Sequence, residues 1–265
     1  MAGSARNFLF SPDSGDVALT RLLATAARVT GFMQGAPGAP LPGWHVPGAD
    51  NRAFLETLHA RVAATYPKAG KAYYATHLWT SLIWQPAYLA VIAVHVHGAL
   101  PDLRTMSQAL RNYQVSGFRL PPGPQQPGST EELIARAGRD LRALADDMLA
   151  EINTVARIKR RPALRLLADR MLGLMLRLRD YVPGTTIGEQ KHFCDLWLSA
   201  MGLTGEGDLE TLDLADGRQV LIIARKGCCL DYLATPGTYC ASCPKQDDEV
   251  RIARQRDEAI AELDG

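Results

Sequence analysis

The chain has 265 residues, of which 47% are hydrophobic and 22% charged, the composition of a globular protein with a sizeable core. Its formal net charge of +1 gives no reason to expect nucleic acid as a partner. Residues 1–16 lack the pattern of a signal peptide, and the longest apolar run, residues 82–100, is interrupted by a glutamine, a proline and two histidines. We therefore expect no transmembrane segment and a cytoplasmic protein, with peripheral attachment to the inner membrane left open.

The N-terminal part of the chain favours helices separated by loops. Apolar residues at helical spacing predict a helix over 16–33, and further helices are expected over 53–66 and 71–84. The segment 35–48 is rich in proline and glycine, which predicts a loop. Residues 86–98 fit either a buried helix or a strand.

A second stretch rich in proline and glycine, residues 121–128, predicts the best boundary between two parts of the chain. It divides the chain into an N-terminal helical part, 1–120, with a candidate substrate pocket, and a C-terminal helical part, 129–265. The C-terminal part includes a hairpin and a cysteine-bearing segment, 225–246.

Helices dominate the start of the C-terminal part. Ser129 and Glu132 form a capping-box pattern, which predicts a helix reaching about residue 158. Pro162 suits the first turn of a second helix, to about residue 181, and a third is expected over 188–201.

After these helices, the spacing of the apolar residues changes from that of a helix to that of a strand. Residues 209–214 and 218–224 flank Asp216-Gly217, a strong hairpin signal. The acidic residues after Pro244 predict the first turn of a terminal helix, with the last cysteines at its N-terminus. The predicted fold class is mainly α (α+β), with a small antiparallel β element leading into the cysteine segment.

Four of the five cysteines lie within sixteen residues, as the adjacent pair Cys228 and Cys229 followed by Cys240-x-x-Cys243. A turn at Pro236-Gly237 would fold the two halves of this segment onto each other. Four converging sulfurs suit tetrahedral zinc or an iron–sulfur cluster, and two disulfides are the remaining alternative. The fifth cysteine, Cys194, has aromatic and apolar neighbours and is expected to be buried.

With its flanking residues, the pattern C-C-x10-C-x2-C resembles the C-terminal signature of the FhuF-type ferric-siderophore reductases. The resemblance covers residues 225–244 and includes Arg225, Leu230, Tyr232 and Pro244; elsewhere only length and helical character agree. It implies a [2Fe–2S] cluster as cofactor. The ligands that the resemblance implies are Cys228, Cys229, Cys240 and Cys243.

Two groups of residues are candidates for contact with a substrate. Five polar or aromatic residues lie at spacings of three and four, so they form either the lining of a siderophore pocket or a core with satisfied polar groups: Tyr73, His77, Ser81, Trp84 and Tyr88. Arg225 and Lys226 precede the cysteines, where they form either a positively charged face beside the cluster or a solvated strand end.

Three functions follow from these patterns. The resemblance implies an oxidoreductase that transfers one electron from the cluster to siderophore-bound Fe(III), which releases iron because hard oxygen donors hold Fe(II) far less tightly. The alternatives are a [2Fe–2S] electron carrier or redox sensor without a siderophore substrate, and a zinc-stapled binding module. The glycines at 202, 205 and 207 do not form a dinucleotide fingerprint, so we expect an external donor of the ferredoxin or reductase type.

Overall fold

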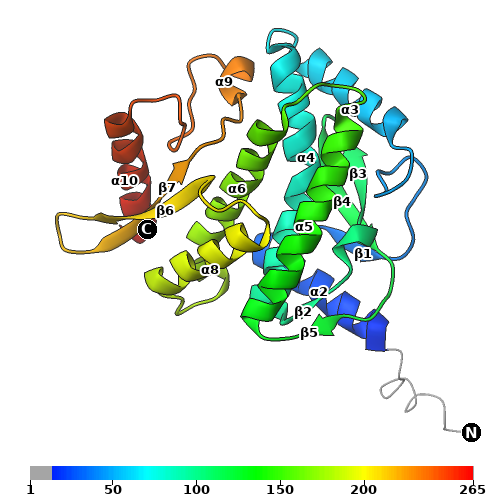
Figure 1. Ribbon diagram of the computed structural model, residues 1–265, viewed down its shortest axis with the longest axis horizontal. Helices are drawn as coiled ribbons and strands as arrows, with labels where there is room; N and C mark the ends of the chain where they lie inside the picture. Colours follow the sequence, from blue (N-terminus) through cyan, green and yellow to red (C-terminus); the bar gives the residue numbers. More distant parts are fainter. Residues whose placement is uncertain (1–13, 265) are drawn as a thin grey trace, which may run out of the picture.

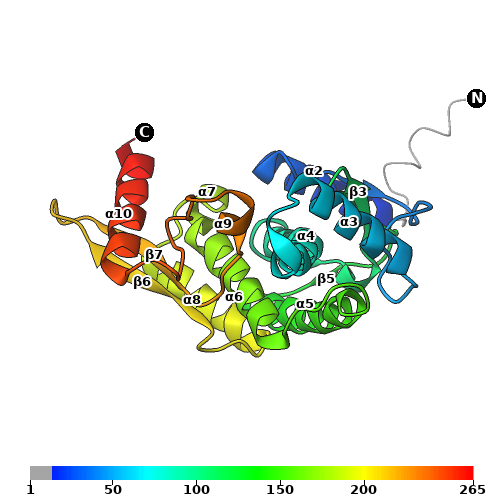
Figure 2. The ribbon, with the colours of Figure 1, turned by 90° about the horizontal axis from the view of Figure 1, so that it is seen from above.

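The computed structural model describes residues 14–264 and is mainly helical with small sheets, which confirms the predicted α+β class. Four helices pack against one another through the middle of the molecule: α4 (Gly70–Ile92), α5 (Thr130–Ile152), α6 (Arg160–Leu176) and α8 (Ile187–Ala200) (Figure 1). Seen from above, α2 (Ser14–Thr30) and α3 (Arg52–Thr65) lie at one end, and a hairpin with α10 (Asp248–Asp264) lies at the other (Figure 2).

Three helices build the N-terminal end: α2 (Ser14–Thr30), α3 (Arg52–Thr65) and α4 (Gly70–Ile92). α4 continues past the predicted end at residue 84, through Pro86, and a π-helical turn (Ala93–His97) follows. Residues 86–97 are therefore helical and not a strand. Burial of Pro86 and its neighbours within the core outweighs the hydrogen bond that proline cannot donate.

One helical stretch in the described part of the chain, Gly70–His97, is long and apolar enough to cross a membrane. Its most apolar window is 67% buried inside the protein, which is typical of the core helix of a globular fold.

A three-stranded sheet in the order β1-β4-β3 lies against α4, and the sequence did not predict it. Its strands are β1 (Gly35–Pro37), β3 (Ser107–Arg111) and β4 (Gln114–Leu120). The predicted loop 35–48 was therefore wrong for its first three residues. β1 fits because Gly35 has no Cβ, which would otherwise collide with the ring of Phe118. A second small pair joins β2 (Ala99–Leu100) to β5 (Gln126–Pro127).

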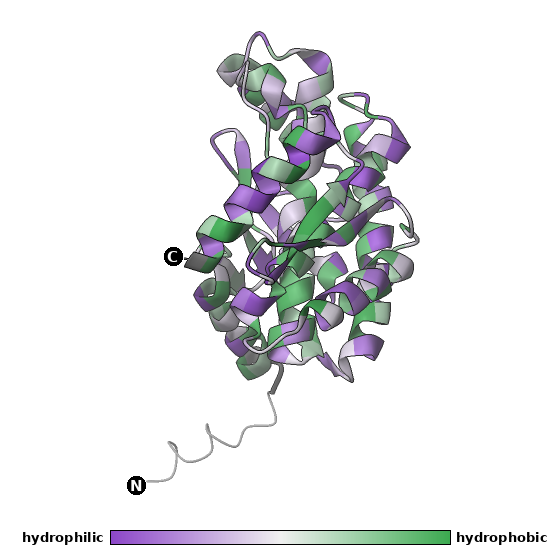
Figure 3. Cartoon of the chain, turned by 90° about the vertical axis from the view of Figure 1, so that its left-hand side faces the viewer, coloured by the Kyte–Doolittle hydropathy of each residue, from purple (hydrophilic) through white to green (hydrophobic). Residues whose placement is uncertain are grey.

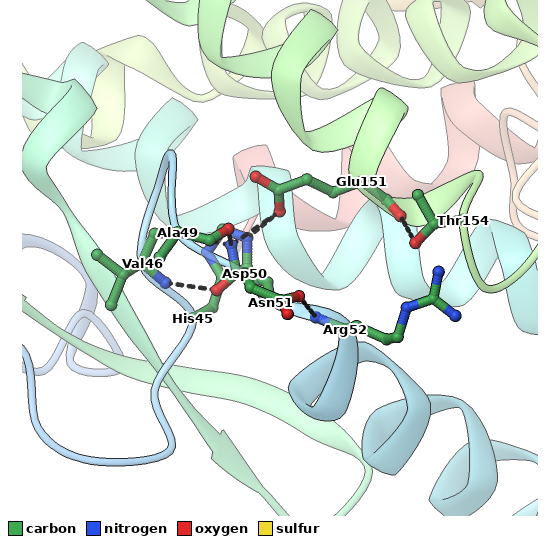
Figure 4. A network of polar contacts seen from close by, with 8 residues as sticks. All are labelled: His45, Val46, Ala49, Asp50, Asn51, Arg52, Glu151 and Thr154. Atoms are coloured by element: carbon green, nitrogen blue, oxygen red, sulfur yellow. Dashed lines mark hydrogen bonds and ion pairs between the residues drawn. The ribbon is translucent and has the colours of Figure 1, made fainter.

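A buried polar network fastens the rest of that loop to α5 (Figure 4). His45, which is fully buried, contacts the Glu151 carboxylate through Nε2 at 2.9 Å. Asn51 donates to the same carboxylate at 3.0 Å and to the carbonyl of Val46 at 2.9 Å. The loop is thus held in a fixed conformation although it has almost no regular structure.

The C-terminal part begins with α5 (Thr130–Ile152), whose predicted capping box is confirmed: Ser129 accepts from the Glu132 N–H, and Glu132 accepts from the Ser129 N–H. α5 ends at Ile152 rather than near residue 158, because Asn153 and the turn after it cap its last carbonyls. The following helices are α6 (Arg160–Leu176), α7 (Leu178–Tyr181) and α8 (Ile187–Ala200).

The predicted hairpin is confirmed as β6 (Gly207–Asp213) and β7 (Gln219–Arg225), joined by a turn in which Gly217 has a φ of +82°. α6 and α10 both pack on β7, which explains why its central residues, 220–224, form an apolar run. In Figure 3 the hairpin faces the viewer, and its hydrophobic strand residues contrast with the polar residues of the surrounding helices.

Two helices complete the chain, the single turn α9 (Asp231–Ala234) and the longer α10 (Asp248–Asp264). The expectation that Cys240 and Cys243 lie at the N-terminus of the last helix was wrong, since α10 begins five residues after Cys243. The intervening residues form turns, with Cys243 donating to the Cys240 carbonyl and Gln246 to the Cys243 carbonyl. No charge–dipole effect of α10 therefore acts directly on these two sulfurs.

A single cluster of buried apolar side chains runs from Leu19 on α2 to Leu221 on β7. It includes residues from both sides of the predicted boundary at 121–128. The central helices that form it also carry the residues beside the cysteines.

Candidate metal centre

The four cysteines lie in the segment that connects the end of β7 to the start of α10. The segment folds back at Pro236-Gly237, as predicted: Thr238 donates to the Thr235 carbonyl at 3.2 Å, and Gly237 has a φ of +83°. The rings of Tyr232 and Tyr239 stack across the fold at 5.5 Å.

Backbone N–H groups point at the first two sulfurs. The N–H of Leu230 donates to the Cys228 thiol and that of Asp231 donates to the Cys229 thiol. Leu230 has a φ of +63°, a left-handed conformation that costs a non-glycine residue energy. This strained turn brings two consecutive N–H groups to adjacent sulfurs, an arrangement that favours negative charge on them.

The thiols also act on one another. A hydrogen bond from Cys240 lowers the pKa of the Cys229 thiol to about 7, against the effect of burial. Burial raises the pKa of Cys228, and the charges of Cys229 and Cys243 raise it further. The charges of Cys229 and Cys243 act on Cys228, and Cys240 acts on Cys229, so the four thiols are neighbours.

Arg225 is held beside this set by a buried partner. Its Nε lies 3.1 Å from Asp169 Oδ2, and its Nη1 donates to Cys240 Sγ at 3.5 Å. Burial raises the pKa of Asp169 to about 6, while the charge of Arg225 opposes the rise. Gly227 completes the contact, because its N–H donates to the same Asp169 oxygen and a Cβ there would collide with it.

Lys226 does not belong to this site. It is exposed and donates to the carbonyl of Gly205 at 2.6 Å, in the turn before β6. The structure thus brings only Arg225 of the predicted cationic pair to the cysteines.

A cavity of about 310 Å³ opens beside Cys229 and Cys240. Three arginines and two aspartates line it together with Thr80, Tyr88 and Ser242; these charged residues are Arg170, Arg177, Arg225, Asp169 and Asp231. A second cavity, of about 340 Å³, shares Thr80 and Arg170 with the first and extends along α4 to Phe32.

The predicted stripe on α4 contains residues with satisfied polar groups and residues that line a cavity. Tyr73 is buried and lies 3.4 Å from His77 Nδ1, and His77 Nε2 lies 2.9 Å from the carbonyl of Tyr113. Trp84 donates to the carbonyl of Val115 at 2.8 Å. The polar groups of these three residues are therefore satisfied, yet His77, Ser81 and Trp84 also line the second cavity.

Arg170 and Phe32 were missed by the sequence-based prediction. Arg170 is half-buried on α6, with its guanidinium 5.9 Å from the centre of the Tyr88 ring, and no described carboxylate pairs with it. Phe32 is 49% exposed and contacts the rings of Trp84 and Tyr88 at 5.7 and 5.4 Å. A spacing of seven between Arg170 on α6 and Arg177, which caps the C-terminal end of α6, was the available signal for the arginines.

The remaining cysteine and a nearby histidine are structural. Cys194 is 1% exposed, as predicted, and burial raises the pKa of its thiol to about 12. His95 accepts a hydrogen bond from Trp197 Nε1 at 3.0 Å, and burial lowers its pKa to about 4.

As they stand, no three histidine, cysteine, aspartate or glutamate side chains among residues 14–264 are close enough together to hold one metal ion. The four thiols instead form a chain of neighbours, with N–H donors and a guanidinium directed at them. Soft thiolates in such a set fit a binuclear iron–sulfur centre, in which each iron takes only two of them.

No family model matches the chain, and no solved structure matches it. The resemblance to the FhuF-type reductases therefore rests on the residues of the cysteine segment.

Proposed function

We propose that this chain is a cytoplasmic ferric-siderophore reductase. One electron reduces siderophore-bound Fe(III) to Fe(II), which the chelator then releases. The electron comes from an external ferredoxin-type or reductase donor. The proposed ligands of a [2Fe–2S] cluster are Cys228, Cys229, Cys240 and Cys243. When bound, such a cluster supplies a site that accepts and passes on one electron at a time.

The observation that carries this proposal is the contact between the cysteines and a cavity. Cys229 and Cys240 are joined by a hydrogen bond, and both border the 310 Å³ space lined by arginines. A chelate in that space would lie against the ligand sulfurs, at a distance that suits electron transfer. A buried structural zinc site has no need for such a cavity.

The surrounding residues have separate roles in this function. The N–H groups of Leu230 and Asp231 and the guanidinium of Arg225 stabilise negative charge on the sulfurs. Asp169 and Gly227 hold the guanidinium in place. Arg170 and Arg177 attract an anionic chelate to the cavity.

Anaerobic purification tests the cofactor. We expect about two irons and two sulfides per chain, visible absorbance, and an EPR signal only after one-electron reduction. Stoichiometric zinc in colourless protein would instead indicate the binding module.

Turnover tests the reaction. Reduced protein is mixed with a ferric siderophore, and a chromogenic Fe(II) chelator reports the product. If no ferric chelate oxidises the reduced cluster, the protein is an electron carrier or a redox sensor instead.

A further inference from the structure

Two of the four proposed ligands border the 310 Å³ cavity, and the other two do not. Cys229 and Cys240 line that cavity, whereas Cys228 and Cys243 lie outside it. Cys228 is nevertheless partly exposed, so the cysteine segment has a second side that solvent can reach. While a chelate fills the cavity, an electron donor has to approach the cysteines from another side. The residues around Cys228 are therefore of interest.

A pair of stacked tyrosine rings lies near Cys228. The ring centres of Tyr232 and Tyr239 are 5.5 Å apart, with an angle of 30° between the ring planes, and neither residue lines the cavity. Lys245 Nζ lies 5.3 Å from the centre of the Tyr232 ring. Burial raises the pKa of the Cys228 thiol, and the charge of Lys245 opposes that rise. Lys245 thus lies close to both the rings and Cys228.

The rings continue into an exposed part of α10. Tyr239 is 38% exposed, and Val250 on α10 is 48% exposed. Arg254 joins the two, because its Nη2 donates to the Tyr239 carbonyl at 2.8 Å and it lies one helical turn after Val250. Tyrosine combines an apolar ring with a polar hydroxyl and is enriched where proteins meet. We call the surface formed by Tyr232, Tyr239, Lys245, Val250 and Arg254 the tyrosine face.

The two cations of the tyrosine face are available to a partner. Lys245 is exposed, and neither Lys245 nor Arg254 forms an ion pair with a carboxylate of residues 14–264. Of the nearby acidic residues, Asp248 is paired with Arg251 at 2.9 Å, and Asp231 lines the cavity instead. Unpaired cations beside aromatic rings favour an acidic partner, because opposite charges steer the encounter of two proteins.

We propose that the tyrosine face is the docking surface for an acidic one-electron carrier protein of the ferredoxin type. The carrier and the chelate then approach the cysteines from different sides, so both can be bound at once. The carrier gives up one electron, and siderophore-bound Fe(III) takes it up. The inference rests on the proposed function for the need of a donor, and it adds the surface where that donor binds.

Cross-linking tests the position of the partner without any electron transfer. The full chain is mixed at low ionic strength with an oxidised, acidic plant-type [2Fe–2S] ferredoxin. A water-soluble carbodiimide then joins lysine amines to carboxylates as amides and takes up the water that is released. Mass spectrometry identifies which lysines of the chain have reacted, and we expect Lys245 among them. Cross-links that leave out Lys245, or no cross-link at all, would overturn the proposal.

Charge reversal tests the same contact in solution. Lys245→Glu should slow reduction of the protein by ferredoxin about tenfold at low ionic strength, and the difference should shrink as salt rises. Arg21→Glu changes the net charge equally, on α2, which lies at the other end of the molecule from α10 (Figure 2), and it should leave the rate within about twofold of wild type. Stopped-flow absorbance measures both rates. Equal slowing in both variants would overturn the proposal, because net charge alone would then explain it.

A small reductant separates docking from a change in reduction potential. Reduced methyl viologen is a cation that needs no docking surface, so it should reduce Lys245→Glu no more slowly than wild type. Slowing with both reductants would count against the docking surface.

Tyr239→Ala tests the aromatic part of the face. It should slow reduction by ferredoxin about three- to tenfold at every salt concentration, because ring contact is not screened by ions. An unchanged rate would remove the rings from the docking surface and overturn the proposal as stated. Since cross-linking needs no ferric chelate and no turnover, the docking surface can fail while the chain still reduces a chelate, and it can be found where the chain does not.

Discussion

Asp169 on α6 and Arg225 at the end of β7 form an ion pair of 3.1 Å in which both side chains are almost inaccessible, at 7% and 14% exposure. The pair joins the central helices to the strand that leads into the cysteines. It also sets the position of the guanidinium that donates to Cys240.

Asp169→Ala should therefore destabilise the fold strongly. The change leaves Arg225 buried without its partner and removes the acceptor of the Gly227 N–H. We expect a loss of about 3 kcal/mol in the free energy of unfolding, measured by urea denaturation. Asp216→Ala, which removes an exposed carboxylate beside Arg218, should cost less than about 1 kcal/mol. Equal losses of unfolding free energy in the two variants would show that the buried ion pair contributes no more to stability than an exposed one.

Serine substitution separates the proposed ligands from the fifth cysteine. Cys228→Ser, Cys229→Ser, Cys240→Ser and Cys243→Ser should each bleach or destabilise the visible chromophore of anaerobically purified protein. Cys194→Ser should keep the spectrum and lower stability by about 1–3 kcal/mol, because it places a hydroxyl among buried apolar atoms. Colourless Cys194→Ser protein would contradict the ligand assignment.

Arg225 and Lys226 should differ in their effect on the reduction potential. We compare Arg225→Gln, made together with Asp169→Asn to avoid a lone buried charge, with Lys226→Gln. The first should lower the potential by on the order of 40 mV, because a positively charged donor to Cys240 is lost.

Lys226→Gln should leave the potential nearly unchanged, since this side chain is bonded to Gly205 instead. Redox titration followed by EPR measures both. Equal shifts of the reduction potential in the two proteins would show that Arg225 and Lys226 act together beside the cysteines, as the sequence predicted.

NADPH alone should reduce neither the protein nor a ferric chelate. The glycines at 202 and 205 lie in the turn between α8 and β6, and Gly207 is the first residue of β6, which pairs antiparallel with β7. No βαβ unit therefore surrounds them. Stopped-flow absorbance with and without an added reductase checks this, and direct turnover by the purified chain would contradict it.

The buried His95 should make the fold sensitive to acid. Burial lowers its pKa to about 4 in the folded state, against about 6.5 when unfolded, so the unfolded chain binds the proton first. Stability from this residue is complete above pH 6.5 and is lost as the pH falls toward 4. The loss at pH 5 should be on the order of 2 kcal/mol.

His95→Gln should flatten the pH dependence of the melting temperature between pH 7 and pH 5. His192→Gln, at an exposed position on α8, serves as the control and should retain the wild-type slope. A similar slope in all three proteins would show that other groups cause any acid sensitivity.

The sequence predicted the elements whose signals are local. Ser129 with Glu132, and Asp216 with Gly217, specify a helix start and a hairpin through contacts within a few residues, and both are present. In the sheet of β1, β3 and β4, β1 was missed because its pairing depends on a distant partner, with Gly35 beside Phe118. β3 and β4 form a local hairpin through Asn112-Tyr113, which lacks the Asn-Gly or Asp-Gly signal of such turns.

The same distinction holds at the candidate site. The cysteines and Arg225 were predicted from one short segment. Asp169 and Arg170 come from α6, more than fifty residues earlier, and only the packing of α6 against β7 brings them to the cysteines. Phe32 reaches the second cavity from the end of α2, and no pattern in the chain connects it with Trp84.

The position of the cysteine segment between β7 and α10 has a consequence for how a cofactor would be acquired. The N–H of Ile223 on β7 donates to Gln255 Oε1 on α10 at 2.8 Å, so this contact holds the two ends of the segment together. Because protein contacts close this loop, the entropy of loop closure is part of the cost of folding. In a zinc finger, by contrast, metal binding itself drives folding. In this chain, contacts between protein residues, such as that of Gln255 with Ile223, bring together the two ends of the segment that carries the four sulfurs.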